Sequence, residues 1–282
     1  MQIDQITTSP TLTFDALTGG DPGAPLVLLL HGFAESMHCW RAQVTALAAA
    51  GYRAIAPGQR GYSPGARPDT GDVANYHIER LMDDAMAIVA ASGYGEARFH
   101  LAATTGAAAL PGRWPTVLRS GWRRSRCCPG RTRTPSIVRC RSPMAIRRSG
   151  RGITRRLEPD AADVVLADDA RWLRERLAAN GVPAIAKHLS VLGDKDAMEA
   201  ALAWYRARGA IRGPLGPIRV PTLYIWGDAD DTVGRTAAEG TVDFVAASYR
   251  FEVLPGVGHF AADQVPERVS ELLLAHVASH PA

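Results

Sequence analysis

The sequence predicts an α/β fold: a mostly parallel, doubly wound sheet flanked by helices, with a helical lid, or cap. A continuous apolar run at Pro25–Leu30 is typical of a strand buried on both faces of a parallel sheet. Strand-like and helix-like segments alternate up to Ala103 and again from Pro221. Residues 160–210, between these two parts, show helical patterns only, which indicates an insertion.

The first part of the predicted core occupies residues 1–150, and its elements follow from apolar patterning and turn residues. They are an edge strand at Thr11–Leu17, a strand at Pro25–Leu30, a helix at Trp40–Ala50, a strand at Tyr52–Ala56, a helix at Ile78–Ala91 and a strand at Arg98–Ala103.

The cap is predicted at residues 155–215, and the second part of the core at residues 216–282. This second part is expected to contain a strand from Pro221, a helix at Arg235–Ser248, a strand at Tyr249–Leu254 and a closing helix at Pro266–Ser279.

Composition narrows the class of protein. The chain has 282 residues, 46% of them hydrophobic, which is enough for one sizeable core. It has no apolar run of about 20 residues and no basic-then-apolar start, so we expect a cytoplasmic protein without a membrane partner. The cysteines lack zinc-ligand spacing, and we expect neither a metal nor a cofactor; they are Cys39, Cys127, Cys128 and Cys140. The sequence does not indicate an oligomeric state.

Five short motifs occur in a characteristic order. They are HGFAES from His31, RGYSPGARP from Arg60, WYRA from Trp204, WGDAD from Trp226 and GVGHF from Gly256. Together they resemble the α/β-hydrolase family, most closely its epoxide-hydrolase and haloalkane-dehalogenase branch. The resemblance covers residues ~11–102 and ~157–280.

The resemblance implies a two-step hydrolysis of a small-molecule epoxide, haloalkane or ester. A carboxylate attacks carbon to form an ester, and a histidine oriented by an acid then activates water. It implies that His259 is this base and Asp230 the acid, although Asp228 and Asp231 compete as loop acids. Tyr205 matches a lid tyrosine that polarises the epoxide oxygen, with a helix-packing role as the alternative.

The resemblance also implies an oxyanion site at the end of the strand Pro25–Leu30. Phe33, following His31 and Gly32, matches the residue whose backbone N–H binds the oxyanion, although a simple core role is the alternative. Two departures from the branch are visible. No second lid tyrosine lies near residues 154–157, and Gly58 replaces the usual Asp.

One motif is misleading. Residues 61–65 spell G-x-S-x-G, the pattern of a nucleophile turn between a strand and a helix. Pro64 directly follows Ser63, and the next residues are typical of a loop. We therefore interpret Ser63 as structural.

The expected nucleophile turn, at residues 103–107, lacks its motif. Ala103 and Ala107 replace the glycines, and Thr105 stands at the nucleophile position. The sequence therefore predicts an inactive member of the branch, with the sheet possibly disrupted at residues 103–151. Two alternatives are an esterase-like hydrolase that uses Thr105, and a non-catalytic ligand-binding protein.

A shift of reading frame accounts for the missing motif. The codons for residues 103–107 must read GCN, ACN, ACN, GGN and GCN, and a one-base slide permits Gly-His-Asp-Trp-Gly. Residues 97–157 contain fifteen arginines and no acidic residue, as slipped reading of a GC-rich gene gives. A basic nucleic-acid-binding insert is the alternative, but aromatic residues are sparse there and no recognition motif occurs. We therefore interpret residues ~103–151 as frame-shifted and expect no nucleic-acid partner.

Overall fold

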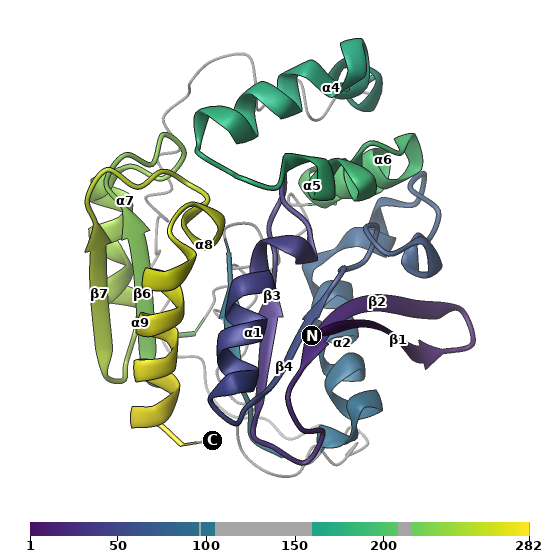
Figure 1. Ribbon diagram of the computed structural model, residues 1–282. Helices are drawn as coiled ribbons and strands as arrows, with labels where there is room; N and C mark the ends of the chain where they lie inside the picture. The colour runs from purple at the N-terminus through teal and green to yellow at the C-terminus, as the bar shows by residue number, and fades with distance from the viewer. Residues whose placement is uncertain (96, 105–159, 208–215, 282) are drawn as a thin grey trace, which may run out of the picture.

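The computed structural model describes residues 1–95, 97–104, 160–207 and 216–281, and shows an α/β architecture (Figure 1). The larger sheet has five strands in the order β1-β2-β4-β3-β5, and β6 pairs with β7 in a second sheet. The strands are β1 (Gln2–Ser9), β2 (Leu12–Gly19), β3 (Leu26–Leu30), β4 (Arg53–Pro57), β5 (His100–Ala103), β6 (Thr222–Gly227) and β7 (Tyr249–Leu254).

The N-terminal strands correct one expectation. We predicted an edge strand at Thr11–Leu17, but β2 pairs on both sides, with β1 and with β4. The edge belongs to β1, whose residues are mostly exposed or half-buried and give little apolar signal. The pairs β3–β4, β3–β5 and β6–β7 are parallel, as the fold class requires.

Strand β3 is buried on both faces, as its continuous apolar run predicts. Because side chains alternate along a strand, Leu28 and Leu30 pack in the cluster that contains the Ile88 side chain of α2 (Ile78–Val89). Val27 and Leu29 pack in a second cluster with α1 (Arg41–Ala49). The sheet is thus covered by helices on both faces.

Helix α1 also connects the first part of the core to the C-terminal helix. Its Val44 and Leu47 share an apolar cluster with Val277 of α9 (Pro266–Ser279), and Figure 1 shows the two helices side by side. The buried Gln43 Nε2 donates hydrogen bonds to the carbonyl oxygens of Ala262, at 3.3 Å, and Pro266, at 3.2 Å. The C-terminal helix is therefore held to the core by apolar packing and by a buried side-chain amide.

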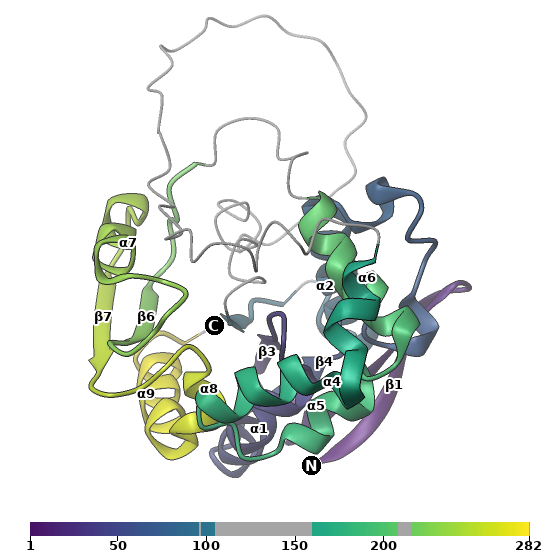
Figure 2. The same cartoon turned by 90° about the horizontal axis from the view of Figure 1, so that it is seen from above.

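Three helices form the described part of the predicted cap: α4 (Ala161–Ala179), α5 (Ile185–Leu192) and α6 (Lys195–Arg206). They lie together at one end of the molecule (Figures 1 and 2). Arg67 forms an ion pair with Asp194, and Trp204 Nε1 donates to the Arg60 carbonyl at 2.9 Å. These contacts attach the cap to the loop that follows β4.

The second part of the core contains β6, β7 and their helices. Helix α7 (Arg235–Glu239) ends earlier than predicted, because the chain tightens into a 3₁₀ helix at Gly240–Phe244. Strand β7 and helix α9 have the predicted bounds, and α8 (Ala261–Gln264) lies between them.

The predicted disruption of the sheet falls mostly on residues 105–151, outside the described residues. Ala103 and Thr104 still pair along β3.

Ser63 has the structural role that we inferred from sequence. Its Oγ donates to the Gly58 carbonyl at 2.5 Å and accepts from the Asp15 N–H at 3.0 Å. It precedes a 3₁₀ turn at Pro64–Ala66, and is itself buried. A Cβ added to Gly58 would lie 2.9 Å from the Ser63 Oγ, so glycine at this position leaves room for the Ser63 hydroxyl.

The described residues contain no helix that is both long and apolar enough to cross a membrane.

Candidate active site

Two loops that follow neighbouring parallel strands bring a histidine and an aspartate together. Asp230 follows β6, and His259 follows β7. The His259 Nδ1 lies 3.0 Å from Asp230 Oδ1 and 2.9 Å from Oδ2, so the expected contact is present. Both side chains are nearly buried, with exposed fractions of 9% and 6%. The carboxyl ends of parallel strands are where α/β folds build their sites.

The contact determines how the imidazole can act. A carboxylate accepts hydrogen bonds, so Nδ1 carries a proton and donates a hydrogen bond to the Asp230 carboxylate. Nε2 is then the atom that can take a proton from water. Asp230 Oδ1 also accepts from the backbone N–H groups of Thr232, at 2.7 Å, and Val233, at 2.9 Å, which fix the carboxylate.

The three candidate loop acids have separate partners. Asp228 Oδ1 accepts from the Gly256 N–H at 2.7 Å, where Gly256 has φ of 70°. Asp231 pairs with Arg176 of the cap, and this hydrogen bond lowers the pKa of Asp231. Of the three, Asp230 is the residue that contacts His259.

The two loops approach each other closely, which explains a glycine at the end of β6. A Cβ added to Gly227 would lie 2.1 Å from the Val257 carbonyl oxygen. No side chain fits at that distance, so a larger residue would push the His259 loop away from the Asp230 loop. Gly227 therefore sets how close the pair can come.

The loop after β3 lies under the cap. Phe33 is buried, and its ring packs edge-to-face on that of Tyr205 from α6, with centroids 5.3 Å apart. Ala34 has φ of 72°, a strained conformation for a residue with a side chain, and it turns the chain directly after Phe33. Such strain is typical of functional loops. The structure thus brings the predicted oxyanion residue and the predicted lid tyrosine together.

His31 holds this loop in place. Its Nε2 accepts from the Gln59 N–H at 3.2 Å, and its carbonyl accepts from the Gln59 side chain at 2.6 Å. Burial lowers the pKa of His31 to about 3, so it is neutral near pH 7. These hydrogen bonds connect the start of the Gly32–Phe33 segment to the loop that follows β4.

A second buried polar group lies beside this loop. His188 of α5 accepts from the Ser36 N–H through Nδ1, at 3.0 Å, so its Nε2 carries the proton and donates to Asp263 at 3.0 Å. Glu35 is 2% exposed, and burial, followed by the nearby negative charge of Asp263, raises its pKa well above the usual value. Glu35 and Asp263 therefore form a pair of neighbouring carboxyl groups, in which Glu35 favours its protonated form.

We expect Glu35→Gln to stabilise the protein increasingly as the pH rises. A carboxyl group whose folded pKa is raised adds stability below its unfolded pKa and loses it as the pH climbs toward the folded pKa. The neutral amide does not titrate, so the stability of the variant relative to the parent should grow as the pH rises above the usual pKa of a glutamate. Urea unfolding between pH 5 and 7 measures this difference.

Glu175→Gln is the matched control, because Glu175 is exposed on α4. Its difference from the parent should not change over the same pH range. An equal, pH-independent difference for both variants would contradict the raised pKa of Glu35.

Sequence reasoning missed several polar residues at this site: Glu35, Arg176, Asn180, His188 and Asp263. Glu35 could have been found, since a carboxylate in HGFAES, the loop that follows a buried strand, is unusual among otherwise apolar or small residues. The cap residues have no local signal, because their partners lie far away in the chain. Thr105, the candidate nucleophile position, lies outside the described residues.

The model of the family described as "Alpha/beta hydrolase family" matches residues 27–272. The chain therefore belongs to the α/β-hydrolase family. Within this family it is epoxide-hydrolase-like, as its curated relatives indicate.

Two curated relatives match most of the chain. Epoxide hydrolase A of Mycobacterium tuberculosis is 28% identical over 302 residues, which cover 90% of this chain and 91% of the relative. AB hydrolase superfamily protein YfhM of Bacillus subtilis is 27% identical, with 94% of each chain covered.

Solved structures share the fold. An epoxide hydrolase from Vigna radiata has a TM-score of 0.75 at 21% identity, covering 98% of each chain. A laboratory-evolved variant of potato epoxide hydrolase has a TM-score of 0.79 at 19% identity, covering 99% of this chain and 100% of the other. These matches support the predicted fold class.

Proposed function

We propose that this chain retains the water-activating half of an epoxide-hydrolase site and lacks the nucleophile that forms the covalent ester. The observation that carries the proposal is the Asp230–His259 pair, with the imidazole Nε2 left for water. In the implied reaction this pair hydrolyses an ester that a carboxylate first forms with the substrate. Thr105 stands at the carboxylate position, so the first step has no carboxylate to begin it.

The contact between Phe33 and Tyr205 supports an epoxide as the substrate class. In the proposed role, the Tyr205 hydroxyl donates a hydrogen bond to the epoxide oxygen as its carbon–oxygen bond opens. In the same proposal the backbone N–H of Phe33, whose ring contacts that of Tyr205, would bind the oxyanion. The substrate would therefore bind between the cap and the carboxyl ends of β3 and β6.

We further propose that residues ~103–151 derive from a shifted reading frame. The sequence supports this: the one-base slide permits Gly-His-Asp-Trp-Gly, and the region is rich in arginine without acidic residues. Ala103 is the last residue of β5 and the Thr104 N–H still donates to the Leu30 carbonyl, while residues 105–151 lie outside the described residues.

We expect no turnover of styrene oxide or of haloalkanes above background. Loss of a nucleophile typically lowers the rate by many orders of magnitude, because the remaining groups cannot form the covalent intermediate. The measurement is the initial rate of diol or halide release by the purified full-length chain. An ester such as p-nitrophenyl acetate tests the esterase-like alternative.

Thr105→Ala is the control for this experiment. Hydrolysis that is measurable in the parent and lost in Thr105→Ala would show that the threonine is a working nucleophile, contrary to the proposal. Saturable binding of styrene oxide without turnover would favour the ligand-binding alternative.

A further inference from the structure

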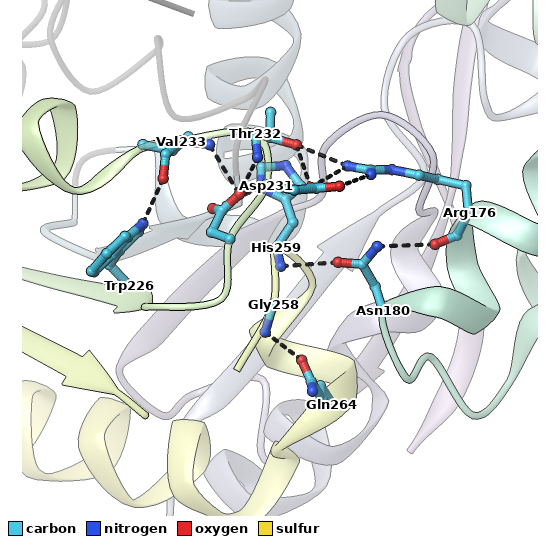
Figure 3. Close-up of polar contacts among 10 residues, drawn as sticks. Arg176, Asn180, Trp226, Asp231, Thr232, Val233, Gly258, His259 and Gln264 are labelled. Atoms are coloured by element: carbon cyan, nitrogen blue, oxygen red, sulfur yellow. Dashed lines mark hydrogen bonds and ion pairs between the residues drawn. The ribbon is translucent and has the colours of Figure 1, made fainter. Parts of the chain in front are cut away.

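The last turn of cap helix α4, together with Asn180 directly after it, contacts both loops of the Asp230–His259 pair (Figure 3). Asn180 Oδ1 accepts a hydrogen bond from the His259 backbone N–H at 3.2 Å. Arg176 binds the other loop, where its Nη2 lies 2.8 Å from Asp231 Oδ1 and 2.8 Å from Thr232 Oγ1. One turn of one helix thus holds the loops that follow β6 and β7.

The two contacts reinforce each other. The Asn180 side-chain amide also donates to the Arg176 carbonyl at 3.0 Å, so both residues are tied together across one helical turn. Asn180 is 8% exposed, which makes its hydrogen bonds costly to lose. The Arg176 guanidinium also lies 6.0 Å from the centre of the Phe260 ring, directly after His259.

The histidine loop is shaped to accept this contact. A Cβ added to Gly258 would lie 2.7 Å from Asn180 Oδ1, so glycine is needed for the close approach. On the other side, the Gly258 N–H donates to Gln264 Oε1 at 2.7 Å. Gly181, with φ of 68°, turns the chain away directly after Asn180. The loop is held between the cap on one side and α8 on the other.

These contacts matter because the acid and the base lie on separate loops. The hydrogen bond between Nδ1 and the carboxylate forms only when the two loops are correctly placed relative to each other. Small displacements of reacting groups lower reaction rates strongly. Asp230 is fixed by the turn at Thr232, and that turn is held by Arg176. Asn180 fixes the backbone of His259 itself.

We propose that Asn180 and Arg176 are positioning residues through which the docked cap holds the Asp230–His259 pair together. The proposal rests on the proposed function for the chemical role of the pair, whereas the geometry does not depend on turnover. It adds a function to the cap: besides covering the site, the cap assembles the water-activating pair.

The test uses the proton on His259 Nδ1 in the full-length chain. A proton shared with a carboxylate gives a far-downfield NMR signal that exchanges slowly with water, and its loss in His259→Gln assigns it. In Asn180→Leu we expect its exchange to be about tenfold faster, the factor that corresponds to one lost hydrogen bond. Asn180→Asp, which keeps an acceptor for the His259 N–H, should restore a rate close to that of the parent.

Arg176→Gln provides an independent arm, with Arg174→Gln as its matched control. Arg174 lies on the same helix but pairs with Asp169 within the cap. We expect faster exchange in Arg176→Gln and the parental rate in Arg174→Gln. If Asn180→Leu does not fold, the comparison of Arg176→Gln with Arg174→Gln tests the proposal on its own.

The proposal would be overturned if the Nδ1 proton exchanged at the same rate in the parent, Asn180→Leu and Arg176→Gln. It would also be overturned if Arg176→Gln and Arg174→Gln accelerated this exchange equally. Absence of the protected signal from the parent would also overturn it. None of these outcomes depends on turnover, so a failure of the proposed function is recorded separately by the activity assay.

Discussion

A gene shifted by one base between the codons for Ala102 and about Gly150 is expected to encode an active epoxide hydrolase. The shift permits Gly-His-Asp-Trp-Gly, which supplies a carboxylate nucleophile and two glycines for the strained turn. Removing a nucleophile in a hydrolase lowers kcat by about 10⁶, so restoring one should raise the rate by several orders of magnitude. Diol formation from styrene oxide measures the rate, and mass spectrometry of the quenched protein detects the ester intermediate.

The corrected protein should also be more stable. The shifted reading removes most arginines from a segment that the family uses for a buried strand, and each unpaired buried charge is strongly destabilising. We therefore expect a higher melting temperature and better solubility.

Two controls accompany this experiment. Replacing the restored aspartate by asparagine should abolish hydrolysis. Thr105→Asp in the present chain should remain inactive, because alanines at 103 and 107 replace the two glycines that the strained turn of the motif requires. An inactive corrected protein, or close relatives that encode the present frame with an ordered basic segment, would contradict the frame-shift proposal.

Loss of the buried ion pair between Arg60 and Asp84 is expected to destabilise the protein strongly. Arg60 Nε and Nη2 donate to the two Asp84 oxygens, both at 2.6 Å, and each side chain is 8% exposed. Burial raises the pKa of Asp84 against the opposing effect of Arg60. Asp84→Asn leaves the Arg60 charge buried without a counter-charge, a change that typically destabilises by about 3–5 kcal/mol.

Asp83→Asn is the matched control on the same helix. Asp83 is 72% exposed and lies 3.9 Å from Arg80, so its removal should change stability by less than about 1 kcal/mol. Urea unfolding at pH 7 compares the two variants. Equal midpoints would show that the Arg60–Asp84 pair adds no net stability.

The sequence predicted the parts of the fold that leave a local pattern. Strand β3 is an uninterrupted apolar run, and β7 and α9 show clear alternation or amphipathic spacing, so their positions follow from the residues alone. Strand β1 was missed because most of its side chains are polar and none of them is fully buried. Its position depends on pairing with β2, which no local pattern reports.

The site was predictable to a similar degree. His259 and Asp230 follow strands of a motif-rich region, and their contact follows from the shared sheet edge. The choice of Asp230 over Asp228 and Asp231 depends on which carboxylate each loop turns inward, and that is visible only in three dimensions. Asn180 could not be found from sequence, because its partner His259 lies 79 residues away.

The anchoring of α1 to the C-terminal segment has a consequence for synthesis. Gln43 bonds to carbonyl groups that lie 219 and 223 residues later in the chain. Translation at about 5–20 residues per second delivers those partners on the order of 10–40 s after α1. During that interval the apolar surface at Val44 and Leu47 is without α9 over it. The nascent chain therefore exposes the apolar surface of α1 until α9 has been synthesised. A chaperone that binds this surface during synthesis should raise the yield of folded protein.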